Sequence, residues 1–210
     1  MKKNVLFVSL AMLLCMSPLY AQVAERIALP APKRTGGMPL FEALDKRQTI
    51  RSYSMQVPDL QVISNLLWAA SGVNRPDGRR TAPTARNMQE IDIYVIMEDG
   101  WYLFEPGEHA LLKMGSEDLR EHAGSQDFVW TAPLNLIYVA DYDKMGGDDQ
   151  SKVFYSATDT GFISQNVYLF CASEGMATVV RGLVDRERLR SVLKLRPAQH
   201  VVLGQTVGYP

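Results

Sequence analysis

Arg47 and Arg51 are the side chains of this chain best suited to binding an anion. They flank Thr49 in residues 47–53, where a helical pattern of apolar residues gives way to an extended one. A guanidinium forms charge-assisted, bidentate hydrogen bonds to phosphate, and a neighbouring hydroxyl adds a further contact. Taken alone, the stretch also fits a solvated helix end, because basic residues are favourable near a helix C-terminus. The arginines therefore predict an anion site only together with the rest of the chain.

Residues 81–87 form a second candidate segment, directly before a strand-like run. Pro83 biases the residue before it towards an extended shape, and Thr84 adds a hydroxyl. The amide of Asn87 both donates and accepts hydrogen bonds, which suits the alternating edge of a heteroaromatic ring. An ordinary capped loop has the same composition. This segment therefore indicates a cofactor site only when it is considered together with Arg47 and Arg51.

A third candidate segment spans residues 175–182, after a long apolar helix pattern. Gly182 has no side chain, so a ligand can approach its backbone closely. Arg181 places a cation beside that glycine.

The order and spacing of these segments resemble the nitroreductase family of flavoproteins. Residues 47–53 resemble the start of the family's sequence, residues 161–166 and 175–182 its middle, and residues 204–210 its end. The resemblance implies an α+β, nitroreductase-like fold in which a central, mostly antiparallel sheet is flanked by helices. It also implies a homodimer with FMN as the cofactor.

The same resemblance implies residue roles. Arg47 would hold the flavin phosphate, and Arg51 would lie beside the pyrimidine edge of the ring, where its charge stabilises the reduced flavin. Residues 180–182 would pass along the flavin mainly by backbone, with Arg181 reaching the phosphate or a substrate anion. The predicted cofactor-binding residues are Arg47, Gln48, Thr49, Arg51, Pro83, Thr84, Asn87, Val180, Arg181 and Gly182. No catalytic acid or base is assigned, because the flavin carries the chemistry.

The sequence departs from the family at its end. Many relatives continue past the Gly-Tyr-Pro motif with a basic residue, whereas this sequence ends at Pro210. The phosphate is then expected to rely on Arg47 with Arg181 or a residue of the partner subunit. The ending is more similar to the branch that oxidises azoline rings in modified peptides. Lys152 and Tyr155 lack the adjacency of that branch's Lys-Tyr pair, so neither is assigned a role.

The predicted function is therefore an exported FMN-dependent oxidoreductase. It would work by a ping-pong reaction through flavin N5, with NAD(P)H or another electron donor and a small organic substrate. Two alternatives stay open. One is a flavin-binding or flavin-scavenging protein without turnover, because nicotinamide donors are scarce outside the cytoplasm. The other is an azoline-type dehydrogenase acting on a modified peptide.

Residues 1–21 are expected to be a cleaved signal peptide. Lys2 and Lys3 precede a run of 12 apolar residues, and Ala21 offers a small residue for cleavage before Gln22. The run is too short for a comfortable membrane span, which needs about 20 residues. A lipoprotein signal at Cys15 is disfavoured by Leu14. The protein is thus predicted to be periplasmic or secreted, without a membrane span.

Composition narrows the classes of protein and of binding site that remain possible. Removing the signal leaves 189 residues, enough for one domain with its own core. It also removes Lys2 and Lys3, which leaves 20 basic against 23 acidic residues, so nucleic acid is not an expected partner. Only Cys171 remains of the cysteines, and His109, His122 and His200 are scattered. A disulfide and a metal site are therefore not expected.

The pattern of apolar residues predicts one domain over 38–210, preceded by an extended arm or linker over 22–37. Helices are expected over 40–44, from residue 58 to about 72, through 119–123, and over 185–195. A further long helix is expected to be capped by Ser156 or Asp159, to run to residue 174, and to be apolar almost all round, as a dimer element is. Strands are expected over 91–97, 101–104, 134–140, 177–180 and 201–207.

Overall fold

A computed structural model describes residues 25–210, so the predicted signal peptide lies outside the described residues. Its centre is a seven-stranded sheet in the order β1-β4-β3-β2-β5-β7-β6, and every neighbouring pair is antiparallel. The strands are β1 (Arg26–Ala28), β2 (Ile91–Met97), β3 (Gly100–Glu105), β4 (Ala110–Gly115), β5 (Leu134–Asp141), β6 (Ala177–Arg181) and β7 (Gln199–Gly208). The predicted α+β class with an antiparallel sheet is confirmed.

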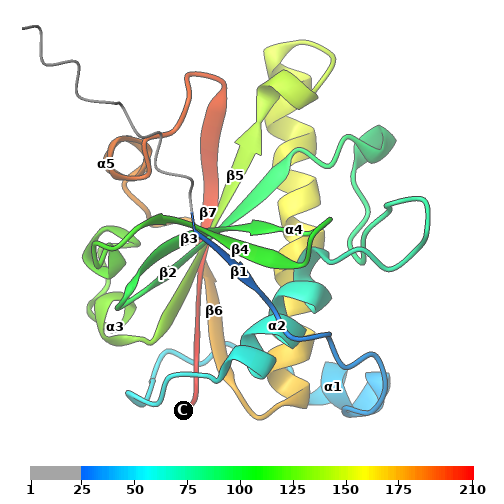
Figure 1. Cartoon of the computed structure of the whole chain (residues 1–210), viewed down its shortest axis with the longest axis vertical. Coiled ribbons are helices and arrows are strands. Elements are labelled where there is room, and N and C mark those ends of the chain that lie inside the picture. The colour runs from blue at the N-terminus through cyan, green and yellow to red at the C-terminus, as the bar shows by residue number, and fades with distance from the viewer. Residues whose placement is uncertain (1–24) are drawn as a thin grey trace, which may run out of the picture.

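Helices cover both faces of this sheet (Figure 1). On one face lie α2 (Leu60–Ser71) and α4 (Asp149–Ser173), and on the other α3 (Asp127–Thr131) and α5 (Arg186–Val192). The helix α1 (Leu40–Lys46) lies beside the C-terminal end of α4. Single 3₁₀ turns, η1 (Ala85–Asn87), η2 (Arg120–His122) and η3 (Tyr142–Lys144), connect the elements.

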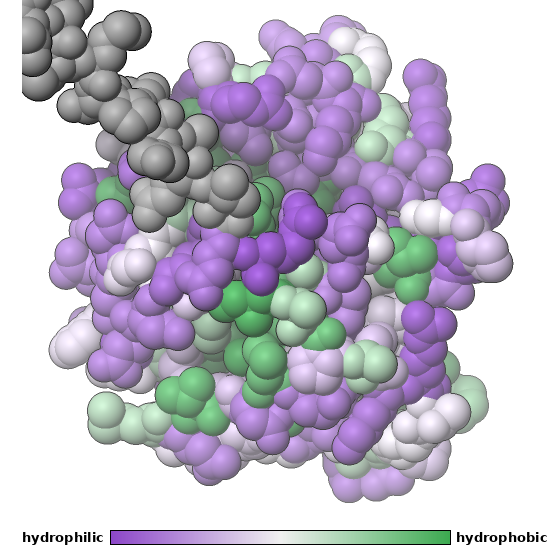
Figure 2. Space-filling model, viewed as in Figure 1, coloured by the Kyte–Doolittle hydropathy of each residue, from purple (hydrophilic) through white to green (hydrophobic). Residues whose placement is uncertain are grey.

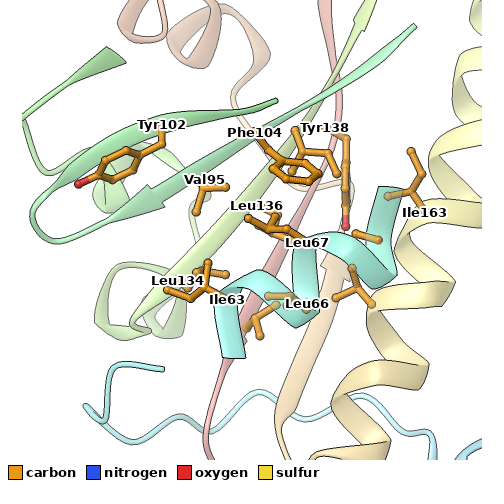
Figure 3. Close-up of a cluster of buried hydrophobic side chains, with 14 of the residues drawn as sticks. Ile63, Leu66, Leu67, Val95, Tyr102, Phe104, Leu134, Leu136, Tyr138 and Ile163 are labelled. Atoms are coloured by element: carbon orange, nitrogen blue, oxygen red, sulfur yellow. The ribbon is translucent and has the colours of Figure 1, made fainter. Parts of the chain in front are cut away.

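The larger core lies between the sheet and the layer formed by α2 and α4. Figure 3 shows Leu66, Leu67 and Ile163 meeting Leu136 and Tyr138 across this layer. Because β5 lies inside the sheet, it is buried at every position, and its sequence is mostly apolar, with Asn135 and Asp141 as the polar exceptions. Cys171 belongs to this core, and burial raises the pKa of its thiol.

The hairpin between β2 and β3 forms where the Asp99-Gly100 pair predicts a turn. Gly100 has a φ of 142°, and a Cβ there would lie 2.4 Å from the carbonyl oxygen of Gly115. The turn therefore requires glycine for both its conformation and its space.

The structure corrects three expected elements. Residues 26–28 of the expected arm form an edge strand on β4, and β4 itself was not expected. The expected helix through residues 119–123 is only the 3₁₀ turn η2. The long helix α4 begins at Asp149, because the carboxylate of Asp148 accepts a hydrogen bond from the Ser151 amide.

The surface of α4 also differs from the expected apolar cylinder. Its buried half carries polar residues, among them Asp159, Thr160 and Ser164, while Phe162 is 45% exposed. On the face of the molecule seen in Figure 2, hydrophilic residues predominate and hydrophobic ones gather near the centre. Among the described helices, none has both the length and the apolar character that a membrane crossing requires.

Candidate functional site

Residues 47–54 run along the free edge of the sheet, where β6 and the end of β7 lie. The Ile50 amide donates to the Thr178 carbonyl at 3.1 Å, and the Ser54 amide donates to the Tyr209 carbonyl at 2.8 Å. The Tyr53 hydroxyl closes the segment on itself by donating to the Ile50 carbonyl at 2.9 Å. These bonds place the predicted phosphate-binding segment beside β6, which carries Val180.

Tyr168 of α4 joins three of the predicted residues. Its hydroxyl lies 3.0 Å from the Thr49 hydroxyl and accepts the Val180 amide at 3.0 Å. The guanidinium of Arg47 lies over its ring, 5.3 Å from the ring centre. The sequence did not identify Tyr168, because it lies within an apolar run and is mostly buried, as a core tyrosine is.

The guanidiniums of Arg47 and Arg51 are available to bind an anion. Arg47 is half-buried and Arg51 is exposed. Within residues 25–210, neither guanidinium lies within 4 Å of a carboxylate. Gln48 points to the other side of the segment, where it lines a cavity of about 340 Å³ with Ile50 and Cys171. Arg47, Thr49 and Arg51 therefore form the candidate anion site, and Gln48 borders a separate cavity.

We expect Tyr168→Phe to loosen this site without unfolding the protein. The change leaves the Val180 amide without its acceptor and frees Thr49, which costs about 1–3 kcal/mol for a buried donor. Hydrogen exchange of residues 47–51 and 180 should therefore speed up while β5 stays protected. Thr158→Ala removes a hydroxyl from the exposed side of α4 and serves as the control. Unchanged exchange in Tyr168→Phe would show that these bonds do not hold the segment.

Residues 83–87 are attached to a different part of α4. The Ala85 amide donates to the Asp159 carboxylate (Oδ2) at 2.9 Å, and the Thr84 hydroxyl accepts the Gln89 amide at 3.0 Å. Arg86, Asn87 and Gln89 have φ of 53°, 55° and 50°. Residues other than glycine seldom adopt this left-handed region, and the surrounding contacts must hold them there.

The two segments contact opposite borders of the buried face of α4. Asp159 and Tyr168 are nine residues apart, which is about 14 Å along the helix and half a turn around it. Figure 1 shows the loop before β2 to the right of α4, whereas residues 47–59 cross the bottom of the molecule. One copy of the chain therefore does not bring Pro83, Thr84 and Asn87 to the arginines.

Arg181 does not take part in the candidate anion site. Its side chain is 4% exposed and points to the opposite face of the sheet, where it donates to the Ala123 carbonyl at 2.8 Å, the Asn135 amide oxygen at 3.1 Å and the Thr206 hydroxyl at 3.1 Å. Burial lowers its pKa to about 10. The expectation that Arg181 reaches a phosphate or substrate anion is wrong, because β6 turns this side chain into a polar network inside the protein.

Gly182 is not forced to be glycine by this chain. It is exposed, and an added Cβ would meet only the Leu203 side chain at 3.9 Å, an ordinary contact. Tyr53 lies beside Gly208, and burial raises the pKa of Tyr53 well above its ordinary value, so its hydroxyl stays a neutral donor. Among the described residues, no three side chains of histidine, cysteine, aspartate or glutamate are grouped as metal ligands.

A larger cavity of about 620 Å³ lies elsewhere, between residues 33–37, α2 and α4. Arg34 and Trp68 line it, with the guanidinium 5.5 Å from the centre of the indole ring. None of the predicted cofactor-binding residues lines this cavity, so it is separate from the site described above.

Comparisons with known proteins identify relatives of this chain. The profile of the nitroreductase family matches residues 44–209. A candidate nitroreductase of Methanocaldococcus jannaschii is 30% identical over an alignment of 180 residues, and the match covers 80% of this chain and 90% of the relative. The crystal structure of a candidate nitroreductase from Ralstonia eutropha superposes with a TM-score of 0.85 at 39% identity, covering 90% of both chains.

A more distant structure shares the fold. The NADPH:FMN oxidoreductase of Vibrio harveyi, solved in complex with NAD⁺, superposes with a TM-score of 0.63 at 19% identity. The match covers 81% of this chain and 68% of the Vibrio chain.

Proposed function

Because this chain belongs to the nitroreductase family, we propose that it is an oxidoreductase that uses FMN to pass electrons from a donor to a small organic acceptor. The observation that carries the proposal is the presence of two guanidiniums, Arg47 and Arg51, that form no ion pair within residues 25–210, on a segment bonded to β6 and α4. The FMN oxidoreductase that shares the fold supports the choice of flavin.

The residues present fit a flavin nucleotide. Arg47 and Arg51 are four positions apart in a non-helical part of the chain, and four steps of extended chain span up to roughly 14 Å. Two cations at that separation can meet the two ends of an elongated ligand. Arg47 would hold the phosphate, oriented by its contact with Tyr168. Arg51 would place a positive charge beside the ring, where reduction adds negative charge.

When bound, flavin supplies the two-electron chemistry of the site. This chain's residues then bind and orient it. The Val180 amide, now bonded to the Tyr168 hydroxyl, lies next to the candidate phosphate segment. The neutral hydroxyls of Thr49 and Tyr168 donate or accept there without adding charge.

The reaction is tested by purifying the mature protein and recording its visible spectrum with and without FMN, followed by anaerobic titration with NADH and NADPH. Bleaching of bound flavin by a nicotinamide donor supports the oxidoreductase. Bound flavin that neither donor reduces would favour a scavenging protein, and reduction by an azoline peptide instead would favour the dehydrogenase branch. No binding at tens of micromolar would contradict the cofactor assignment.

A homodimer is part of the proposal, because one chain places residues 83–87 and the arginines on opposite borders of α4. A second copy would complete each site. Large hydrophobic side chains are exposed on two helices, namely Leu40, Phe41 and Leu44 on α1 and Phe154, Tyr155 and Phe162 on α4. A second copy of the chain would cover such side chains in an interface.

We expect Phe162→Asp to shift the protein from dimer to monomer in sedimentation velocity at micromolar concentration, since a buried unpaired charge opposes association. FMN affinity should fall with it if the site is shared. Ser191→Asp adds the same charge on the exposed side of α5 and should leave the dimer intact. A wild-type monomer at that concentration would contradict the shared site.

Export also remains a proposal, based on the signal-like residues 1–21. Mass spectrometry of the protein recovered outside the cytoplasm should give a chain that begins at Gln22. An intact Met1, or a lipid on Cys15, would contradict it.

A further inference from the structure

Two buried carboxyl groups lie beneath the loop that carries Pro83, Thr84 and Asn87. Glu90 directly precedes β2 and is fully buried, and Asp159 of α4 is 2% exposed. The two carboxyl groups are close enough for the charge of Asp159 to act on Glu90. Asp159 also accepts the Ala85 amide at 2.9 Å, so the pair is directly connected to the loop.

One of two neighbouring buried carboxyl groups must hold a proton, because two negative charges repel each other and burial disfavours the charged form. Within residues 25–210, neither carboxyl oxygen of Glu90 has a hydrogen-bond partner. Asp159 has a donor, the Ala85 amide, and hydrogen bonds from amides stabilise the ionised form. The proton therefore belongs on Glu90.

The neighbouring positive charges do not compensate for a negative charge on Glu90. Lys144 of η3 is near enough to act on it, but its ammonium is bonded to the Asp92 carboxylate at 2.7 Å. Arg80 also acts through space, and its guanidinium is itself partly buried with a long 3.4 Å bond to the Ser71 hydroxyl. Burial and, to a smaller extent, the proximity of Asp159 raise the pKa of Glu90 to about 7, and Lys144 offsets this rise only in part.

The loop above the pair depends on few attachments. Arg86, Asn87 and Gln89 all have the left-handed φ that non-glycine residues avoid. The Ala85 amide is tied to Asp159, and the Gln89 amide is tied to the Thr84 hydroxyl. Weakening the Ala85 bond would therefore let the loop relax from its strained conformation.

We propose that the proton on Glu90 positions the loop 83–87, making Glu90 a positioning residue for flavin binding. While Glu90 is protonated it is neutral, and the Asp159 carboxylate keeps its hydrogen bond from the Ala85 amide. Once Glu90 ionises, two buried negative charges repel each other, Asp159 is displaced, and the loop is released. The consequence for flavin rests on the proposed function; the effect on the loop does not.

The direction of the pH dependence of the loop follows from the raised pKa of Glu90. The folded loop arrangement binds the Glu90 proton more tightly than the unfolded chain does, so its stabilisation is present at low pH and is lost as pH rises through about 7.

The first experiment measures the Kd of FMN between pH 5.5 and 8.5 for the wild type and Glu90→Gln. The amide of the variant is neutral at every pH in this range and does not titrate. We expect the ratio of wild-type to variant Kd to rise about two- to tenfold over this range, the worth of one weakened hydrogen bond. Taking the ratio cancels the titration of the FMN phosphate itself. Glu98→Gln, the same change at an exposed position, should give a constant ratio.

The second experiment uses the flavin-free protein, so that the pair is tested even if flavin does not bind. NMR should show one side-chain carboxyl of the wild type titrating near neutral pH, and amide protection of residues 83–87 falling with the same midpoint. Both changes should be absent in Glu90→Gln. If that variant does not fold, Asp159→Asn removes the like charge and should move the midpoint to lower pH.

The proposal would be overturned if all side-chain carboxyls titrated below pH 5. It would also be overturned if the amide protection of the loop did not change as a carboxyl titrates. If the loop follows the carboxyl but no flavin binds at any pH, the positioning role stands and the proposed function fails. If flavin binds with a constant ratio across the range, the proposed function stands and the control of flavin binding by Glu90 fails.

Discussion

Arg47→Ala is expected to raise the Kd for FMN roughly ten- to a hundredfold while leaving the Kd for riboflavin nearly unchanged. The variant loses a charge-assisted contact to the phosphate, worth about 1.5–3 kcal/mol, and riboflavin has no phosphate to lose. The half-buried guanidinium of Arg47 has no carboxylate within 4 Å in the described chain, so its removal breaks no ion pair of the protein. Titrating both flavins by quenching of flavin fluorescence measures the difference.

The neighbouring Lys46 offers a matched control. Its ammonium is exposed and paired with Glu42 at 2.7 Å, so Lys46→Ala removes the same charge one residue away from the site. We expect this variant to bind both flavins almost as the wild type does. Equal losses for FMN and riboflavin in Arg47→Ala would mean that Arg47 supports the ring or the fold. Arg51 would then be the next candidate for the phosphate, because Arg181 is turned into the protein.

Arg181→Met is expected to lower the free energy of unfolding by about 2–4 kcal/mol, because it leaves the buried Ala123 carbonyl without its donor and removes bonds to Asn135 and Thr206. The melting temperature should fall by about 4–16 °C for a chain of this size. Methionine keeps much of the length of the side chain, so loss of the polar contacts and not a large cavity should cause the effect. Urea denaturation followed by fluorescence measures it.

Arg188→Met serves as the comparison for that variant. Arg188 is exposed on α5, and its guanidinium contacts only the His122 ring at 3.2 Å among the hydrogen bonds of its side chain in residues 25–210. We expect a change within about 0.5 kcal/mol. If Arg181→Met were equally mild but abolished FMN binding, the role assigned to Arg181 from the sequence would be restored and the internal network would be the incidental feature.

Several elements followed directly from local patterns. The Asp59 carboxylate caps α2, which ends before Gly72 as the sequence indicates. The turn at Gly100 and the apolar run of β5 were equally readable, because turn chemistry and burial on both faces leave local signatures.

Other elements depend on partners far away in the sequence. The strand β1 has three residues with an exposed, half-buried, exposed pattern, and it exists through its pairing with β4, about 80 residues later. The first ten residues of α4 are largely polar, and a cap at Asp148 begins the helix earlier than the apolar pattern does. Short edge strands and polar helix ends owe their structure to pairing and capping, so periodicity alone does not locate them.

The features of the candidate site also divide into those that the sequence predicts and those that only the tertiary structure decides. The sequence by itself determined the family resemblance, the antiparallel α+β class and the segment that carries Arg47 and Arg51, because those depend on residue types at short and fixed spacings. Only the tertiary structure decided that Tyr168, 119 residues from Thr49, joins that segment to Val180. It likewise turned Arg181 to acceptors 25 to 58 residues away. A side chain's partners are set by which face of a strand or helix meets which neighbour, and that is a property of packing between distant segments.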